Sequence, residues 1–296
     1  MRGPNETGPL KTHRRHGAPH LAECRSVAGR APRVASTWAS RYGPRRFPVN
    51  DQPSDARQTI TRLLLVLVPM ILAYAVHEFA HAFVASKLGD PTPEEDGRLT
   101  LDPRAHIDPV GTLLFPTLAV LGGGLPMLGW ARPTAFRPDR FTARISPRLG
   151  DALVSAAGPL SNVLFGFVAA VGLVCVQIAS FRSATDATDA RSVGVGLGVL
   201  LLRLVQVNAV LAIFNALPVP PLDGARLLPK VFDPFFAKHG RLLFPLLFLA
   251  IAFVPGVANT VLGRPSAYLE ASLLRAAAKV VVPVAEAILP HAMPVL

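Results

Sequence analysis

Four blocks of this sequence are apolar and long enough to cross a lipid bilayer as helices, and this feature limits the fold more than any other. The blocks cover residues 60–88, 152–180, 194–217 and 242–262. A helix rises about 1.5 Å per residue, so about 20 apolar residues cross a hydrocarbon core about 30 Å thick. Because 51% of the residues are hydrophobic, we predict an all-α polytopic membrane protein with about four transmembrane helices.

Three further segments carry weaker patterns. Glycines and prolines interrupt the apolar block 110–130, so we expect it to dip into the bilayer and return as a re-entrant segment. Residues 97–102 alternate briefly as a strand does, which predicts a short β-like element. Charged residues mixed with Leu, Ala and Val over 266–290 predict an amphipathic helix at the membrane interface.

The N-terminal residues 1–58 differ in composition from the rest of the chain. They contain 11 Lys and Arg and four acidic residues, with Pro and Gly throughout, which predicts a disordered basic tail. A membrane-embedded domain is expected over 59–265, followed by the C-terminal amphipathic segment 266–296. The net charge is +11, but the basic residues avoid the apolar blocks as they do in membrane proteins, so no nucleic-acid partner is expected.

The first apolar block contains the pattern His77-Glu78-Phe79-Ala80-His81. Two histidines four residues apart lie on one face of a helix, so both imidazoles can bind one Zn²⁺ at about 2.0–2.1 Å, with the intervening glutamate near a zinc-bound water. Ionisable residues in an apolar span are costly unless they are paired, metal-bound or hydrated, and they mark functional sites. A hydrogen-bonded polar cluster that joins helices is the alternative interpretation.

A catalytic zinc takes a third protein ligand and leaves its fourth position to water. The candidate in a second apolar segment is Asp223, which follows Pro218, Pro220 and Pro221. These prolines prevent a regular helix, and irregular backbone at membrane depth survives only where it lines protein or a water-filled cavity. A proline-rich loop with a capping aspartate just outside the membrane is the alternative.

A third polar element lies in the block 152–180, in the run Ala157-Gly158-Pro159-Leu160-Ser161-Asn162. Its small residues allow close approach of helix backbones, and Asn162 brings an amide into the bundle. On the residues alone, Asn162 is equally compatible with a contact between helices and with a contact to the oxyanion of a hydrolytic reaction.

Together these three elements resemble the site-2 protease family of intramembrane zinc metalloproteases, peptidase family M50, over roughly residues 60–228. The resemblance implies that His77, His81 and Asp223 bind one Zn²⁺ per chain, and that Glu78 is the catalytic acid and base. It therefore implies a zinc metalloendopeptidase.

The resemblance also implies a catalytic contribution from Asn162, substrates that are transmembrane segments of other proteins, and a role in regulated intramembrane proteolysis. The connection between the two metal motifs is too short for a PDZ domain, so the chain looks like a short-form member of the family. It is expected to be a multi-pass protein of a prokaryotic cell (inner) membrane, with its oligomeric state left open.

The shared metal also constrains the topology. Both metal motifs lie near the C-terminal ends of apolar helices, and the ligands of one zinc must converge within a few ångströms, so the two helices should run in the same direction. Basic residues occur on both sides of the membrane and leave the orientation open. The alternative function is a polytopic metal-ion transporter or metal-binding membrane protein, in which the same residues would form an ion path.

Overall fold

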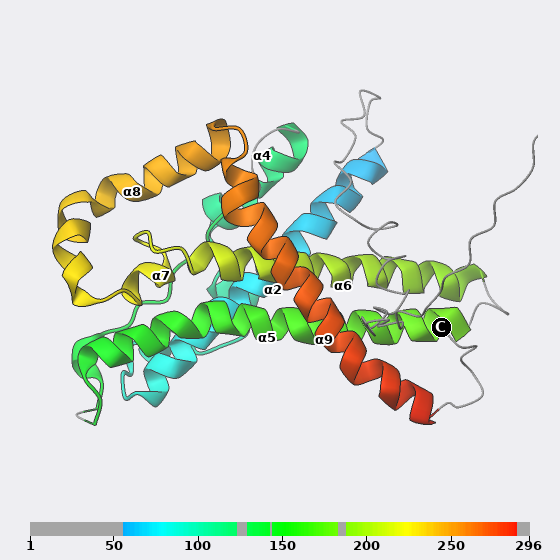
Figure 1. The fold of residues 1–296 in the computed structure, drawn as a ribbon, viewed down its shortest axis with the longest axis horizontal. Helices are drawn as coiled ribbons and strands as arrows, with labels where there is room; N and C mark the ends of the chain where they lie inside the picture. Colours follow the sequence, from blue (N-terminus) through cyan, green and yellow to red (C-terminus); the bar gives the residue numbers. More distant parts are fainter. Residues whose placement is uncertain (1–55, 123–128, 143, 183–187, 289–296) are drawn as a thin grey trace, which may run out of the picture. The chain divides into compact units, whose positions relative to one another are not determined.

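Four long helices carry the apolar blocks of the chain in the computed structural model (Figure 1), which describes residues 56–122, 129–142, 144–182 and 188–288. These helices are α2 (Ala56–Lys87), α5 (Pro147–Arg182), α6 (Thr188–Asn215) and α8 (Asp233–Phe253). Each contains a stretch long and apolar enough to cross a membrane. The prediction of an all-α fold with about four such helices is confirmed.

Shorter elements connect these helices, and one further long helix ends the described chain. In chain order they are α3 (Thr92–Glu95), η1 (Pro103–Ala105), η2 (Pro109–Leu114), α4 (Phe115–Gly122), η3 (Pro138–Arg140), α7 (Asp223–Arg226), η5 (Lys230–Phe232), η6 (Asn259–Gly263) and α9 (Arg264–Ile288). Of the predicted tail, residues 1–55 lie outside the described residues, and residues 56–58 belong to the first turn of α2.

Helix α5 packs against both α2 and α6 and runs antiparallel to both. His77 of α2 contacts Asn162 of α5, and His81, later in α2, contacts Val154, which lies earlier in α5. The two helices therefore run in opposite directions. Asn162 of α5 in turn contacts Asn208 of α6. Further along α5, Gly172 faces Leu201, earlier in α6. Helices α2 and α6 therefore run in the same direction, as the predicted shared metal site requires.

Helix α9 packs across the middle of α5 and α6 (Figure 1). Its buried residues Leu273 and Ala277 join a core cluster with Ala170 of α5 and Val205 of α6. Each of these four side chains is less than a tenth exposed. The C-terminal helix thus shares a core with the long apolar helices.

The expected β-like element over residues 97–102 is wrong. No strand is assigned in the described ranges, and this stretch forms turns and bends that begin at Gly97, whose φ is +65°. The Arg98 side chain is buried and donates hydrogen bonds to the carbonyls of Ala105 and Arg132. Tertiary hydrogen bonds therefore fold back a segment whose short alternating pattern is typical of a strand.

The predicted boundaries of the last apolar helix, 242–262, are also wrong. Helix α8 begins at Asp233 and ends at Phe253, and the following Val254 is extended. Gly256 then adopts φ +85°, a left-handed conformation that favours glycine. The apolar composition continues through this turn into η6, so hydropathy alone does not reveal the break.

The apolar helix formed by η2 and α4 is too short to cross a bilayer. The hydroxyl of Thr112, in η2, donates to the carbonyl of Trp130 at 2.8 Å. The hydroxyl of Tyr74, in α2, donates to the carbonyl of Gly129 at 2.6 Å. Residues 129–130 therefore lie beside the start of the short helix and beside α2.

A buried carboxylate joins the end of α2 to the extended segment that precedes η3. Asp90 is 0% exposed. Its Oδ1 accepts hydrogen bonds from the Thr92 N–H at 3.0 Å and the Thr92 hydroxyl at 2.6 Å, and its Oδ2 accepts from the Arg137 N–H at 2.6 Å. Burial alone raises the pKa of Asp90, but these hydrogen bonds outweigh it and hold the pKa below its ordinary value.

We predict that Asp90→Asn lowers the free energy of unfolding by about 1–3 kcal/mol, because an amide nitrogen would face the Arg137 or Thr92 donors. The pKa of Asp90 is lower in the folded protein than its unfolded value of 3.8, so the ionised carboxylate stabilises the fold above pH 3.8. This stabilisation is lost as the pH falls through the folded pKa. Thermal unfolding of the purified protein between about pH 7 and pH 3 measures both effects. Equal stability of the variant and the wild type at neutral pH would contradict the prediction.

Candidate metal centre

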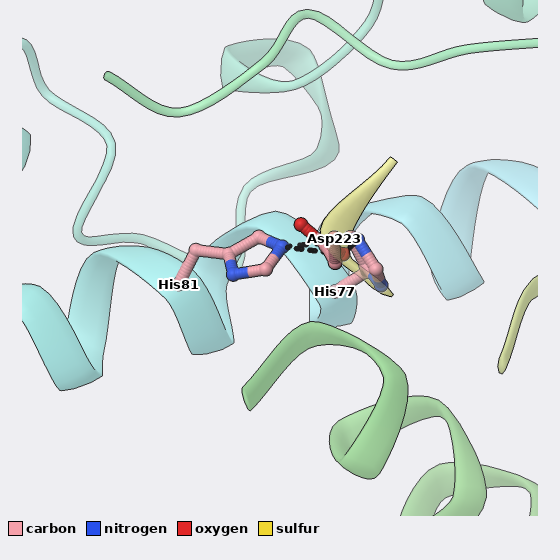
Figure 2. Close-up of side chains that lie close together, drawn as sticks. All are labelled: His77, His81 and Asp223. Carbon is pink, nitrogen blue, oxygen red and sulfur yellow. Dashed lines mark hydrogen bonds and ion pairs between the residues drawn. The ribbon is translucent and has the colours of Figure 1, made fainter. Parts of the chain in front are cut away.

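Two histidines of α2 and the first residue of α7 converge on one point (Figure 2). The Nε2 atoms of His77 and His81 are 3.1 Å apart. The Asp223 Oδ2 atom lies 3.2 Å from the first and 3.3 Å from the second. The histidines are 4% and 6% exposed. Within the described residues this is the group of His, Cys, Asp and Glu side chains arranged to hold a metal ion.

Local structure explains the convergence. The i, i+4 spacing stacks the two imidazoles on one face of α2, with ring centroids 4.6 Å apart. After α6 ends at Asn215, the proline-containing segment turns back and α7 begins at Asp223. Gly224 permits this return, because a Cβ atom there would overlap the backbone of Ala216.

The other ring nitrogens fix how the histidines face the centre. His77 Nδ1 lies 2.6 Å from Asn162 Oδ1, and His81 Nδ1 lies 2.7 Å from the carbonyl oxygen of Val154. Both partners are carbonyl oxygens, which can only accept, so each Nδ1 carries the hydrogen and donates it. In the neutral imidazoles the lone pairs therefore sit on Nε2 and point to the centre.

With both imidazoles neutral, three electron-pair donors thus face one another with no hydrogen between them. Asp223 Oδ2 is buried and has no hydrogen-bond donor. Such an arrangement is repulsive until a cation occupies the centre. Two imidazoles and one carboxylate are a ligand set of catalytic zinc sites, which keep a fourth position for water. The residues present therefore fit Zn²⁺.

Glu78, between the two histidines, is also buried, with 8% exposed. Its Oε2 accepts a hydrogen bond from the backbone N–H of Thr134 at 2.8 Å, and the Thr134 hydroxyl donates to the Glu78 carbonyl oxygen at 3.2 Å. Sequence reasoning missed Thr134, because a threonine in a loop without a motif carries no signal of its tertiary partner.

Asn162 lies at 0% exposure beside His77. Its Nδ2 donates to the Ala73 carbonyl at 3.2 Å and to Asn208 Oδ1 at 2.8 Å. Both amide hydrogens are therefore committed within the protein. Sequence reasoning also missed Asn208, although an amide within an apolar helix is the type of residue that marks a contact between helices.

Gly158 of α5 allows that helix to reach the histidines. A Cβ atom at this position would overlap His81 Nε2 and both Cε1 atoms of the histidine pair. Glycine is therefore required here for close approach, which is the reason for the small-residue run in this part of α5.

The sequence profile of peptidase family M50 matches residues 65–252. This range includes both metal motifs and more than half of the chain. The chain belongs to peptidase family M50. It is an intramembrane zinc metalloprotease, and the family assignment does not favour the alternative of a metal transporter.

The names of similar proteins agree with the family. "Putative zinc metalloprotease YwhC" of Bacillus subtilis (strain 168) is 37% identical over 191 residues, which are 62% of this chain and 80% of the relative. "Putative zinc metalloprotease Rip2" of Mycobacterium tuberculosis (strain H37Rv) is 30% identical over 208 residues, 66% of this chain and 69% of the relative. No solved structure matches the chain.

We predict that Gly158→Ala abolishes zinc binding, because the added methyl group displaces the imidazole atoms that face the centre. The measurement is the zinc content of the purified protein by mass spectrometry. Gly172→Ala, in the same helix, is the matched control, since its Cβ meets Leu201 at an ordinary 3.6 Å. Full zinc content in Gly158→Ala would show that this close approach is not needed.

Proposed function

We propose that His77, His81 and Asp223 hold the zinc and that Glu78 transfers protons while the enzyme hydrolyses peptide bonds in or near transmembrane segments of other membrane proteins. The observation that carries this proposal is the convergence of Nε2, Nε2 and Oδ2 within 3.1–3.3 Å, in a family of peptidases. The substrate class is supported by the position of both metal motifs in or beside long apolar helices.

When bound, zinc would supply Lewis acidity that lowers the pKa of a bound water toward neutrality. The Glu78 carboxylate acts as the base that takes a proton from the attacking water and then delivers it to the leaving amine. The Thr134 N–H holds Glu78 Oε2 in place, so the glutamate keeps one orientation through both transfers. An amine leaves readily only when protonated, so the proton that Glu78 takes from water is used in the second step.

For Asn162 we propose a positioning role in place of direct contact with the oxyanion. Both of its amide hydrogens are donated to protein oxygens, and its Oδ1 accepts from His77. The residue therefore acts on the reaction through His77, whose ring it orients.

The membrane placement of two segments also belongs to the proposal. The contacts of residues 129–130 with Thr112 and Tyr74 support a re-entrant path for the block 110–130. The packing of α9 on the middle of α5 and α6 favours a position at membrane depth over one at the interface. Bacterial relatives support a location in a bacterial cell membrane.

A substrate helix hides its carbonyl groups in its own hydrogen bonds, so it must unwind locally before hydrolysis. The centre lies beside α7, where the chain is irregular, and this favours hydrolysis close to the end of the bundle at which α2 and α6 terminate. The compact chain has no room for a PDZ domain between its metal motifs, so we propose that substrate selection depends on the membrane-embedded helices.

We predict that Glu78→Gln retains zinc but loses proteolysis, because the amide keeps the shape of the side chain and cannot take the proton. Mass spectrometry of protein N termini in membranes, from cells that express the wild type or the variant, reveals the cleavages that depend on Glu78. Glu94→Gln, the same change at an exposed glutamate of α3, is the control. An identical set of N termini from wild type and Glu78→Gln would reject the mechanism.

We also predict one tightly held zinc per chain in the wild type and its loss in His77→Ala, since two remaining ligands bind zinc weakly. Elemental analysis of the purified protein after dialysis measures both. Weak, freely exchanged metal in the wild type is the result expected of a transporter and would contradict the proposed centre.

A further inference from the structure

Two buried amides connect the metal centre to helix α6. Asn162 of α5 and Asn208 of α6 are both 0% exposed. Asn162 Nδ2 donates to Asn208 Oδ1 at 2.8 Å, and Asn208 Nδ2 donates to the Leu204 carbonyl at 2.8 Å. With His77 at the other end, these hydrogen bonds form one continuous path across three helices.

Backbone carbonyl groups decide which side-chain atom donates and which accepts in each hydrogen bond of this path. The Leu204 carbonyl can only accept, so the NH₂ group of Asn208 faces it and the Asn208 oxygen faces Asn162. The Ala73 carbonyl can also only accept. Asn162 therefore turns its NH₂ group toward both acceptors and its oxygen toward His77.

His77 differs from His81 in what orients it. His81 Nδ1 faces a backbone carbonyl, that of Val154, which cannot turn over. His77 Nδ1 faces a side-chain amide, which presents a donor when rotated by half a turn. A rotated Asn162 would favour the hydrogen on His77 Nε2, where it would point into the metal position.

We propose that Asn208 is a positioning residue that keeps Asn162 in the orientation required for His77 to bind zinc. This inference rests on the proposed metal centre. The Asn208 oxygen gives the Asn162 NH₂ group its second acceptor, and a rotated Asn162 would place two oxygens 2.8 Å apart. The contact between α5 and α6 therefore sets the tautomer of a ligand on α2.

The test is Asn208→Ser in the full-length purified protein. A serine hydroxyl can still donate to the Leu204 carbonyl, as serines in helices do, but it is too short to reach Asn162. We expect zinc affinity, measured by competition with a chelator, to fall about tenfold, as when other outer partners of metal ligands are removed. We also expect a changed visible absorption spectrum of the Co²⁺-substituted protein.

Gln206→Ser is the matched control, because Gln206 is an amide on the same helix whose Nε2 bonds Glu270 of α9 at 3.2 Å. It should leave zinc affinity and the Co²⁺ spectrum unchanged. If Asn208→Ser also leaves both unchanged, Asn208 only joins helices and the inference is overturned. Absence of zinc binding in the wild type would instead reject the metal centre itself.

A double variant tests whether Asn208 acts through the orientation of Asn162. In Asn162→Asp, both side-chain oxygens are acceptors, so rotation cannot present a donor to His77. Adding Asn208→Ser to this variant should therefore cause a much smaller further loss of zinc affinity than it causes in the wild type. An equal loss in both backgrounds would show that Asn208 acts independently of the orientation of Asn162, and would overturn the proposal.

Discussion

The structure depends on three electron-pair donors that face one point inside an apolar bundle. His77 and His81 can direct Nε2 to that point only because carbonyl oxygens of α5 accept from both Nδ1 atoms. Asp223 can join them only because α2 and α6 run in the same direction and the chain turns back sharply after α6. The direction of the helices, the glycine at 158 and the irregular backbone near Asp223 all serve this convergence.

Polar groups in the bundle illustrate the cost of burial away from water. Asn162 and Asn208 are fully buried, and each uses both its donor and its acceptor groups in hydrogen bonds. Beside them, Asp223 Oδ2 is a buried carboxylate oxygen without a hydrogen-bond donor. A satisfied network next to an unsatisfied anion indicates that the unsatisfied atom is reserved for a cation.

Residues with a local pattern could be predicted from the sequence, and residues defined by tertiary contacts could not. The i, i+4 histidines, the proline-rich approach to Asp223 and the long apolar blocks each carry their signal within a few neighbouring residues. Thr134 and Asn208 have partners more than 40 residues away. Even where the residue type suggests a contact, as for the amide of Asn208 in an apolar helix, no nearby residue identifies the partner. The same reason explains the incorrect strand at 97–102, where the buried Arg98 decides the conformation.

The bare backbone at Gly158 also determines how the centre can be approached. With α5 pressed against the imidazole rings there, neither water nor a peptide can enter from that flank. Glu78 also lies beside the centre, with its Oε2 held by the Thr134 N–H. A residue without a side chain thus closes one flank of the centre, so a substrate would have to approach from another side.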